Sequence, residues 1–152
     1  MLGTDKTATW IGGGAVAAVT VPVFASLCLG LARASGLPVG NLAQFPTPMI
    51  VLWAPVFGVV IAAPVAFVLG AWAVRSAQRL EASARQRTTI QWCSLIVAVG
   101  GGSWGAVLSQ VDIAGLHVGW MLIPVGLCAG AITGGLVGWI ASSDRGNAAH
   151  AD

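Results

Sequence analysis

The sequence predicts an all-α, polytopic membrane protein in which four transmembrane helices form a bundle with both termini on the cytoplasmic side. Of the 152 residues, 57% are hydrophobic and only 8% are charged, and the mean hydropathy is +0.86. A soluble globular chain carries about 25% charged residues, so these few charges could not cover a water-exposed surface. Four uncharged apolar runs are each long enough to cross a bilayer. We therefore expect a single membrane domain over residues 1–152.

The first apolar run covers residues 10–32 and follows a short polar lead. A secretory signal is one interpretation, because Lys6 precedes the run and the residues around Arg33 fit a small-x-small cleavage site. The apolar core of a signal spans about 7–15 residues, whereas this run is about twenty residues long. The length favours a retained first transmembrane helix.

A loop and a second apolar run come next. Residues 34–48 contain glycines and prolines but no acid or base, which predicts a loop. The second run, residues 49–74, contains Pro55 and Pro64. Prolines are tolerated in a spanning helix when neighbouring groups satisfy the freed carbonyls, and they kink the helix axis. We expect a second transmembrane helix over this run.

Residues 75–89 are expected to form an Arg-rich cytoplasmic loop. Cytoplasmic loops are enriched in Lys and Arg, and such a loop can also contact anionic lipid headgroups or an acidic partner. Glu81 and Arg85 have helical i,i+4 spacing, so the second helix could continue past the membrane. The residues assigned to topology and lipid contact are Arg75, Arg79, Arg85 and Arg87.

The third and fourth runs, residues 90–110 and 115–141, are expected to cross the membrane and to pack on each other. Four glycines of the fourth run recur every fourth residue and so share one helix face. A face without side chains lets another backbone approach closely, and the third run carries a matching glycine pair. Self-association and a groove for a flat lipid or cofactor are the alternatives. The helix-packing residues are Gly126, Gly130, Gly134, Gly138, Gly101 and Gly105.

Tryptophans and charges predict the limits and the orientation of the bundle. Trp53 and Trp72 are nineteen residues apart, and Trp120 and Trp139 repeat that spacing. Nineteen helical residues rise about 28 Å, close to the thickness of the hydrocarbon layer, and Trp prefers its two borders. With both termini inside, six of the seven Lys and Arg are cytoplasmic and only Arg33 is outside. Residues 142–152 are expected to be a disordered tail.

The chemistry of known membrane enzymes and pumps is absent from the runs. No Asp, Glu, Lys or Arg lies inside them, whereas proton-coupled pumps need buried titratable groups. Cys28, Cys93 and Cys128 are far apart in the sequence and are expected to be small buried hydrophobes. His117 beside Asp112 could bind a metal or sense pH, but an interfacial histidine without a role is the simpler interpretation. We assign no catalytic, cofactor-binding or metal-binding residue.

These observations favour a non-enzymatic membrane protein, an accessory or scaffold component. The alternative is a homo-oligomeric channel or transporter for a small neutral solute, built around the glycine faces. The expected partners are the lipid bilayer and either a second copy or a larger membrane complex, with no nucleic acid and no cofactor. Six Arg against one Lys, with abundant Ala and Gly, is typical of a GC-rich bacterial genome, so we expect a bacterial inner membrane.

Overall fold

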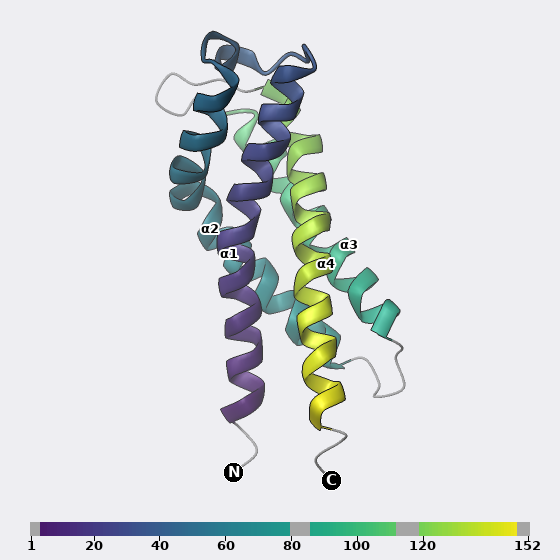
Figure 1. The fold of residues 1–152 in the computed structure, drawn as a ribbon. Coiled ribbons are helices and arrows are strands. Elements are labelled where there is room, and N and C mark those ends of the chain that lie inside the picture. The colour runs from purple at the N-terminus through teal and green to yellow at the C-terminus, as the bar shows by residue number, and fades with distance from the viewer. Residues whose placement is uncertain (1–3, 80–85, 112–118, 149–152) are drawn as a thin grey trace.

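The computed structural model is a bundle of four long helices and describes residues 4–79, 86–111 and 119–148 (Figure 1). All four helices are long and apolar enough to cross a membrane. The prediction of an all-helical chain with four such helices is therefore confirmed. The elements are α1 (Thr4–Ala34), the 3-10 helix η1 (Gly40–Gln44), α2 (Thr47–Arg79), α3 (Gln86–Leu108), the 3-10 helix η2 (Gly119–Met121) and α4 (Leu122–Ala148).

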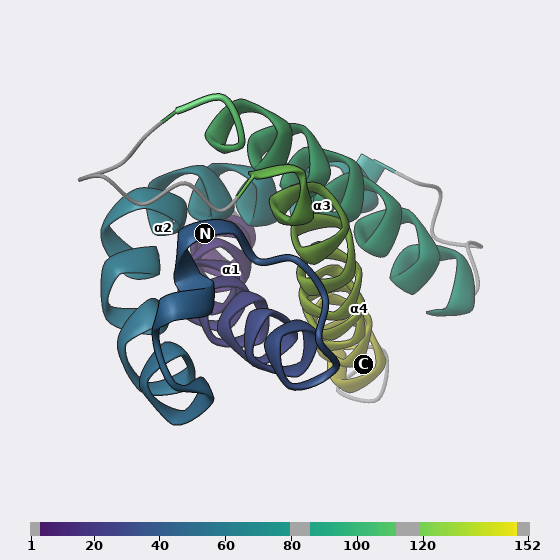
Figure 2. The ribbon, with the colours of Figure 1, turned by 90° about the horizontal axis from the view of Figure 1, so that it is seen from above.

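The four helices form two antiparallel hairpins. Consecutive helices run in opposite directions, so the described parts of both chain ends lie at one end of the bundle and η1 lies at the other (Figure 1). α1 packs along α2 and α3 packs along α4. The hairpins meet mainly where α1 lies beside α4, as the view along the bundle shows (Figure 2). α2 contacts α3 less extensively.

Local sequence signals explain where the helices begin and end. Gly36 follows the end of α1 with φ +75°, a conformation that glycine adopts without strain. The Gly36 amide donates to Arg33 O at 3.1 Å, and the Leu37 amide donates to Ala32 O at 2.9 Å, which is the Schellman motif. Pro48 and Pro124 lie in the first turns of α2 and α4. A backbone N–H in the first turn has no acceptor within the helix, so proline loses no helical hydrogen bond there.

Three helix boundaries differ from the sequence prediction. α2 continues through Arg79 and α3 begins at Gln86, so three of the four arginines expected in a loop are helical. The tail predicted to be disordered from residue 142 continues α4 to Ala148. Charged and polar side chains do not by themselves end a helix, because its backbone hydrogen bonds can continue past them. Arg85 and the rest of residues 80–85 lie outside the described residues.

The start of the last helix also differs from the prediction. The sequence predicts a helix from residue 115, whereas α4 begins at Leu122. Gly119 has φ +70°, which breaks a helix at this point, and η2 connects it to α4. Residues 112–118 lie outside the described residues, and the predicted metal or pH role of His117 and Asp112 falls there.

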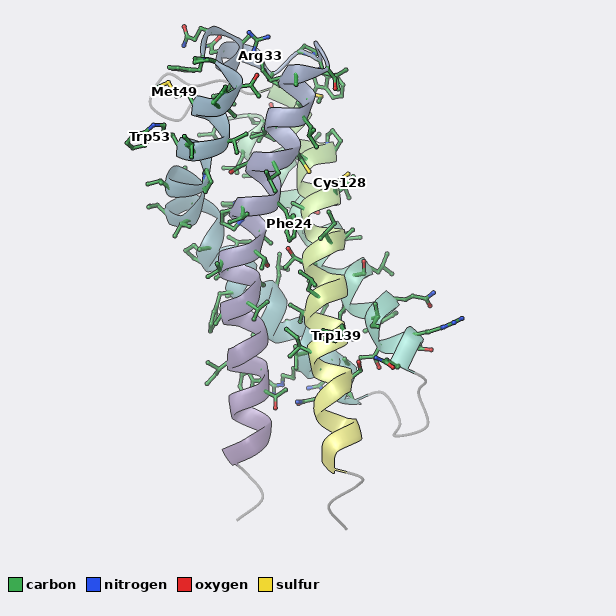
Figure 3. The ribbon with its side chains drawn as sticks, viewed as in Figure 1. Phe24, Arg33, Met49, Trp53, Cys128 and Trp139 are labelled. Carbon is green, nitrogen blue, oxygen red and sulfur yellow. The ribbon has the colours of Figure 1, made fainter. Side chains whose placement is uncertain are left out.

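The interior of the bundle consists of small side chains, and the large ones face outward. Among the described residues, the fully buried positions are mostly Ala, Gly and Val, while Trp53, Trp72, Trp120 and Trp139 are each more than half exposed. Figure 3 shows Trp53 near the η1 end of the bundle and Trp139 toward the other end. Lipid chains are as apolar as Leu, so membrane helices associate through small residues and leave large ones to the lipid.

Candidate functional site

The glycine face of α4 lies directly against the backbone of α3. A Cβ atom built on Gly138 would lie 2.8 Å from Ile90 Cα, and one on Gly134 would lie 2.6 Å from Ser94 Cα. Real Cβ atoms essentially never approach other heavy atoms to within 3.0 Å, so even a methyl group has no room at these positions. Gly130 meets the backbone of α3 in the same way. The four-residue spacing of these glycines therefore corresponds to one continuous contact.

The glycine pair of α3 takes part in the same contact. Gly101 faces the backbone of Gly126, and Gly126 faces the backbone of Gly101 in return. Gly105 faces the carbonyl of Leu122 at the start of α4. The structure thus brings all six predicted helix-packing residues together in one contact, which we call the α3–α4 seam. By contrast, a Cβ on Gly135 would meet no atom within 4 Å, so the seam occupies one face of α4 only.

A second close contact joins α1 to α2, and the sequence analysis missed it. A Cβ built on Gly70 would lie 2.7 Å from Gly13 O and 2.6 Å from Ala17 Cβ. A Cβ on Gly14 would lie 2.9 Å from Phe67 O. We call this contact the α1–α2 seam. Gly13 and Ala17 form a small-xxx-small pair, which was the available signal, but Gly70 has no glycine neighbour at helical spacing to mark its face.

Hydrogen bonds between helices lie both in the α3–α4 seam and between the two hairpins. Thr20 Oγ1 of α1 donates to Thr133 Oγ1 of α4 at 3.2 Å, and Ser94 Oγ of α3 donates to a carbonyl of α4 at 2.9 Å. Cys93 Sγ of α3 donates to a carbonyl of α2 at 3.7 Å. Such bonds stabilise membrane helix pairs by about 0.6–2 kcal/mol each. Small polar side chains in the described core therefore connect helices.

The basic residues are divided between the two ends of the bundle. Arg75, Arg79 and Arg87 belong to the parts of α2 and α3 nearest the chain termini. The Arg75 guanidinium lies over the Trp10 ring, 5.6 Å from its centroid, and so connects the beginning of α1 to the end of α2. Arg33 lies at the opposite end (Figure 3), where its Nη2 donates to a carbonyl of the η1 segment at 2.8 Å.

A small apolar cavity lies between the two hairpins. Its volume is about 80 Å³, and its walls include Val65 of α2, Trp104 of α3 and Val125 of α4. An engineered apolar cavity that binds benzene has a volume of about 150 Å³, so this one is small even for an apolar molecule. The buried Nε1 of Trp104 has no hydrogen-bond partner. The walls are otherwise almost entirely carbon, which gives a polar solute nothing to bind.

The cysteines differ from the prediction that all three are buried. Cys93 is buried, but Cys28 is partly exposed and Cys128 is exposed. Cys28 and Cys128 also line the same groove between α1 and α4, although they are far apart in the sequence. The sequence analysis found no cysteine pair because no spacing rule connects two positions on helices from different hairpins.

Comparisons with known proteins add no family to this description. The described residues contain no group of three or more His, Cys, Asp or Glu side chains that could hold a metal ion. The distinctive features of the described bundle are the two seams, the distribution of arginines, the cavity and the cysteine groove. The chain matches no protein-family model, no curated protein and no solved structure.

Proposed function

We propose that this chain is a non-enzymatic component of a bacterial inner membrane, an accessory or scaffold subunit that crosses the bilayer four times. The observation that carries the proposal is that contacts between helices fill the interior of the bundle. Its faces are occupied by contacts between helices, backbone against backbone in the α3–α4 seam. A bundle of this kind presents an outer surface to lipid or to a partner subunit, and the apolar cavity between its two hairpins is too small for most substrates.

The alternative, a homo-oligomeric channel or transporter, needs a different interface from the one the sequence suggested. That hypothesis placed the contact between copies on the glycine faces of the third and fourth runs. Gly126, Gly130 and Gly134 are instead covered by the α3 backbone of the same chain. A second copy could not reach them without separating α3 from α4. The same contact leaves no open groove there for a flat lipid or cofactor.

Affinity purification and reconstitution distinguish the two functions. From its native membrane, a tagged chain is expected to purify together with a larger complex, because a scaffold acts through its partners. Purified chain in liposomes is expected to leave them sealed to small neutral solutes such as glycerol and urea. A symmetric homo-oligomer that makes liposomes permeable to one of these solutes would contradict the proposal and favour the channel. Liposomes containing an unrelated four-helix membrane protein provide the control for leakage caused by reconstitution.

The proposed orientation places both termini in the cytoplasm. Arg75, Arg79 and Arg87 support it, because these bases gather at the end of the bundle that holds the termini. A phosphatase reporter, which is active only outside the cytoplasm, is expected to be inactive when fused after residue 148 and active when inserted at residue 41. A fluorescent reporter that matures in the cytoplasm should give the opposite pattern. Activity of the phosphatase at the C-terminus would overturn this orientation.

A further inference from the structure

The groove between α1 and α4 has two matching walls. One wall begins on α1 at Cys28 and continues past the end of that helix to Ser35, and the other runs along η2 and α4 from Met121 to Cys128. Each wall uses positions spaced by three, four and seven residues, which form one face of a helix. The groove has a volume of about 300 Å³ and lies at the end of the bundle opposite the termini. In each wall, the cysteine is the lining residue nearest the centre of the bundle.

The register between α1 and α4 places the two cysteines at nearly the same depth. Thr20 is hydrogen-bonded to Thr133, and Ala32 packs in one cluster with Met121. In both pairs the residue numbers add to 153, as expected for antiparallel helices in a fixed register. Cys28 is therefore level with residue 125 of α4, which is three residues from Cys128. At 1.5 Å per residue, Cys28 and Cys128 are offset along the bundle axis by about 4.5 Å.

The direction of the side chains reduces this offset. A helical side chain leans toward the N-terminus of its own helix. The Cys28 thiol therefore leans toward the bundle centre, and the Cys128 thiol, on the antiparallel helix, leans toward the η1 end. Because Cys128 is the deeper of the two, the thiols lean toward each other across the groove that both cysteines line. Met121, seven residues from Cys128, lies about 10 Å away along the axis, so it is not a third member of the pair.

We infer that Cys28 and Cys128 form a redox-active dithiol that closes to a disulfide between α1 and α4. Both thiols are free in this structure, and Cys128 is the more exposed. The bond would join the first hairpin to the second across their common groove. In the proposed orientation this groove lies at the extracytoplasmic border, where disulfides persist. The inference itself rests on the α1–α4 register and stands whether or not the chain is a scaffold.

The oxidant is a compound that itself carries a disulfide. The Cys128 thiolate attacks one sulfur of that compound, which releases one thiolate and leaves a mixed disulfide on Cys128. The Cys28 thiolate then attacks Cys128 Sγ, forms the Cys28–Cys128 bond and releases the second thiolate of the oxidant. The two cysteines together lose two electrons and two protons, and the oxidant is reduced to two thiols. Cys93 takes no part, because it is buried elsewhere, against a carbonyl of α2.

Oxidation of the full-length chain in detergent tests the inference. The membrane-permeant disulfide 4,4′-dithiodipyridine is the probe, and Cys93→Ser removes the uninvolved thiol. We expect two thiopyridones released per chain, a mass loss of two hydrogens and a peptide in which Cys28 is linked to Cys128. The closing rate should not depend on protein concentration. A folded chain, judged by gel filtration, in which the two cysteines keep separate pyridyl adducts would overturn the inference.

Two single substitutions provide the matched controls. Cys28→Ser and Cys128→Ser, each in the Cys93→Ser background, should release one thiopyridone and retain one stable pyridyl adduct. Neither side chain is fully buried, so these variants should fold as the parent does. Linkage of two chains through the remaining cysteine would be seen as a covalent dimer. A dimer that also dominates in the two-cysteine chain would show that the bond forms between copies, which contradicts the intrachain pair.

Discussion

Gly134→Leu is expected to destabilise the bundle strongly, whereas Gly135→Leu, one residue further along α4, is expected to be tolerated. The Cβ of a leucine introduced at position 134 would overlap the Ser94 backbone, and backbone atoms cannot rotate away as a side chain can. Overpacking a core usually lowers the free energy of unfolding by about 1–3 kcal/mol. Because this clash is with backbone atoms, we expect a loss of about 3 kcal/mol or more. For a chain of this size, a loss of about 3 kcal/mol lowers Tm by about 6–12 °C.

Thermal unfolding in detergent, followed by gel filtration after heating, measures this difference. Gly135→Leu is the matched control, because it adds the same side chain to the same helix where a Cβ meets no atom within 4 Å. Leu is also a better helix former than Gly by about 1 kcal/mol, so the control should unfold at the parent temperature or slightly above. Equal Tm values for the two variants would contradict the α3–α4 seam. Gly130→Leu should behave as Gly134→Leu does.

Gly70→Leu is expected to have the second-largest effect, in the other hairpin. Its Cβ would lie 2.7 Å from Gly13 O and 2.6 Å from Ala17 Cβ, so α2 would have to move away from α1. We expect a loss of about 2–3 kcal/mol in the free energy of unfolding, for the same reason as in α4. Separation of α1 from α2 should also make Trp10 and Arg75 lose their contact. Thermal unfolding in the same detergent measures the stability, and the tryptophan emission spectrum reports the change around the rings.

Gly12→Leu is the control for this second prediction. Gly12 is next to Gly13 in the sequence, but a Cβ at position 12 would meet no atom within 4 Å. Glycine content alone therefore predicts equal effects at the neighbouring positions, whereas the packing predicts different ones. A Gly12→Leu variant as unstable as Gly70→Leu would mean that lipid insertion or helix propensity, rather than the α1–α2 contact, determines the result.

The sequence was most informative where a single helix carries the whole signal. The row from Gly126 to Gly138 can be recognised from spacing alone, because its four members lie on one face of one helix. Composition was similarly sufficient for four apolar helices, since a bilayer requires each crossing to be helical and about twenty residues long. Both predictions rest on signals that lie within one contiguous stretch of the sequence.

Features that depend on register between helices could not be found this way. Gly70 has no periodic glycine neighbour, and its importance emerges only when Gly13 lies opposite it. Cys28 and Cys128 are likewise brought together by the way α1 lies beside α4, as fixed by contacts such as Thr20–Thr133. The helix ends were misplaced for a different reason. The charged residues begin at Arg75, but the α2 backbone has no interruption before Arg79.

The division of the bundle into two hairpins has a consequence for its biogenesis. Every residue of the α1–α2 seam precedes residue 80, so the first hairpin has its complete close contact while the ribosome is still translating the second. The α3–α4 seam likewise lies within the last two helices and needs no residue from the first pair. For a chain inserted in the membrane as proposed, the two hairpins would therefore enter it one after the other. Joining the hairpins then leaves the α1–α4 contact and the lesser contacts of α2 with α3 and α4 to form.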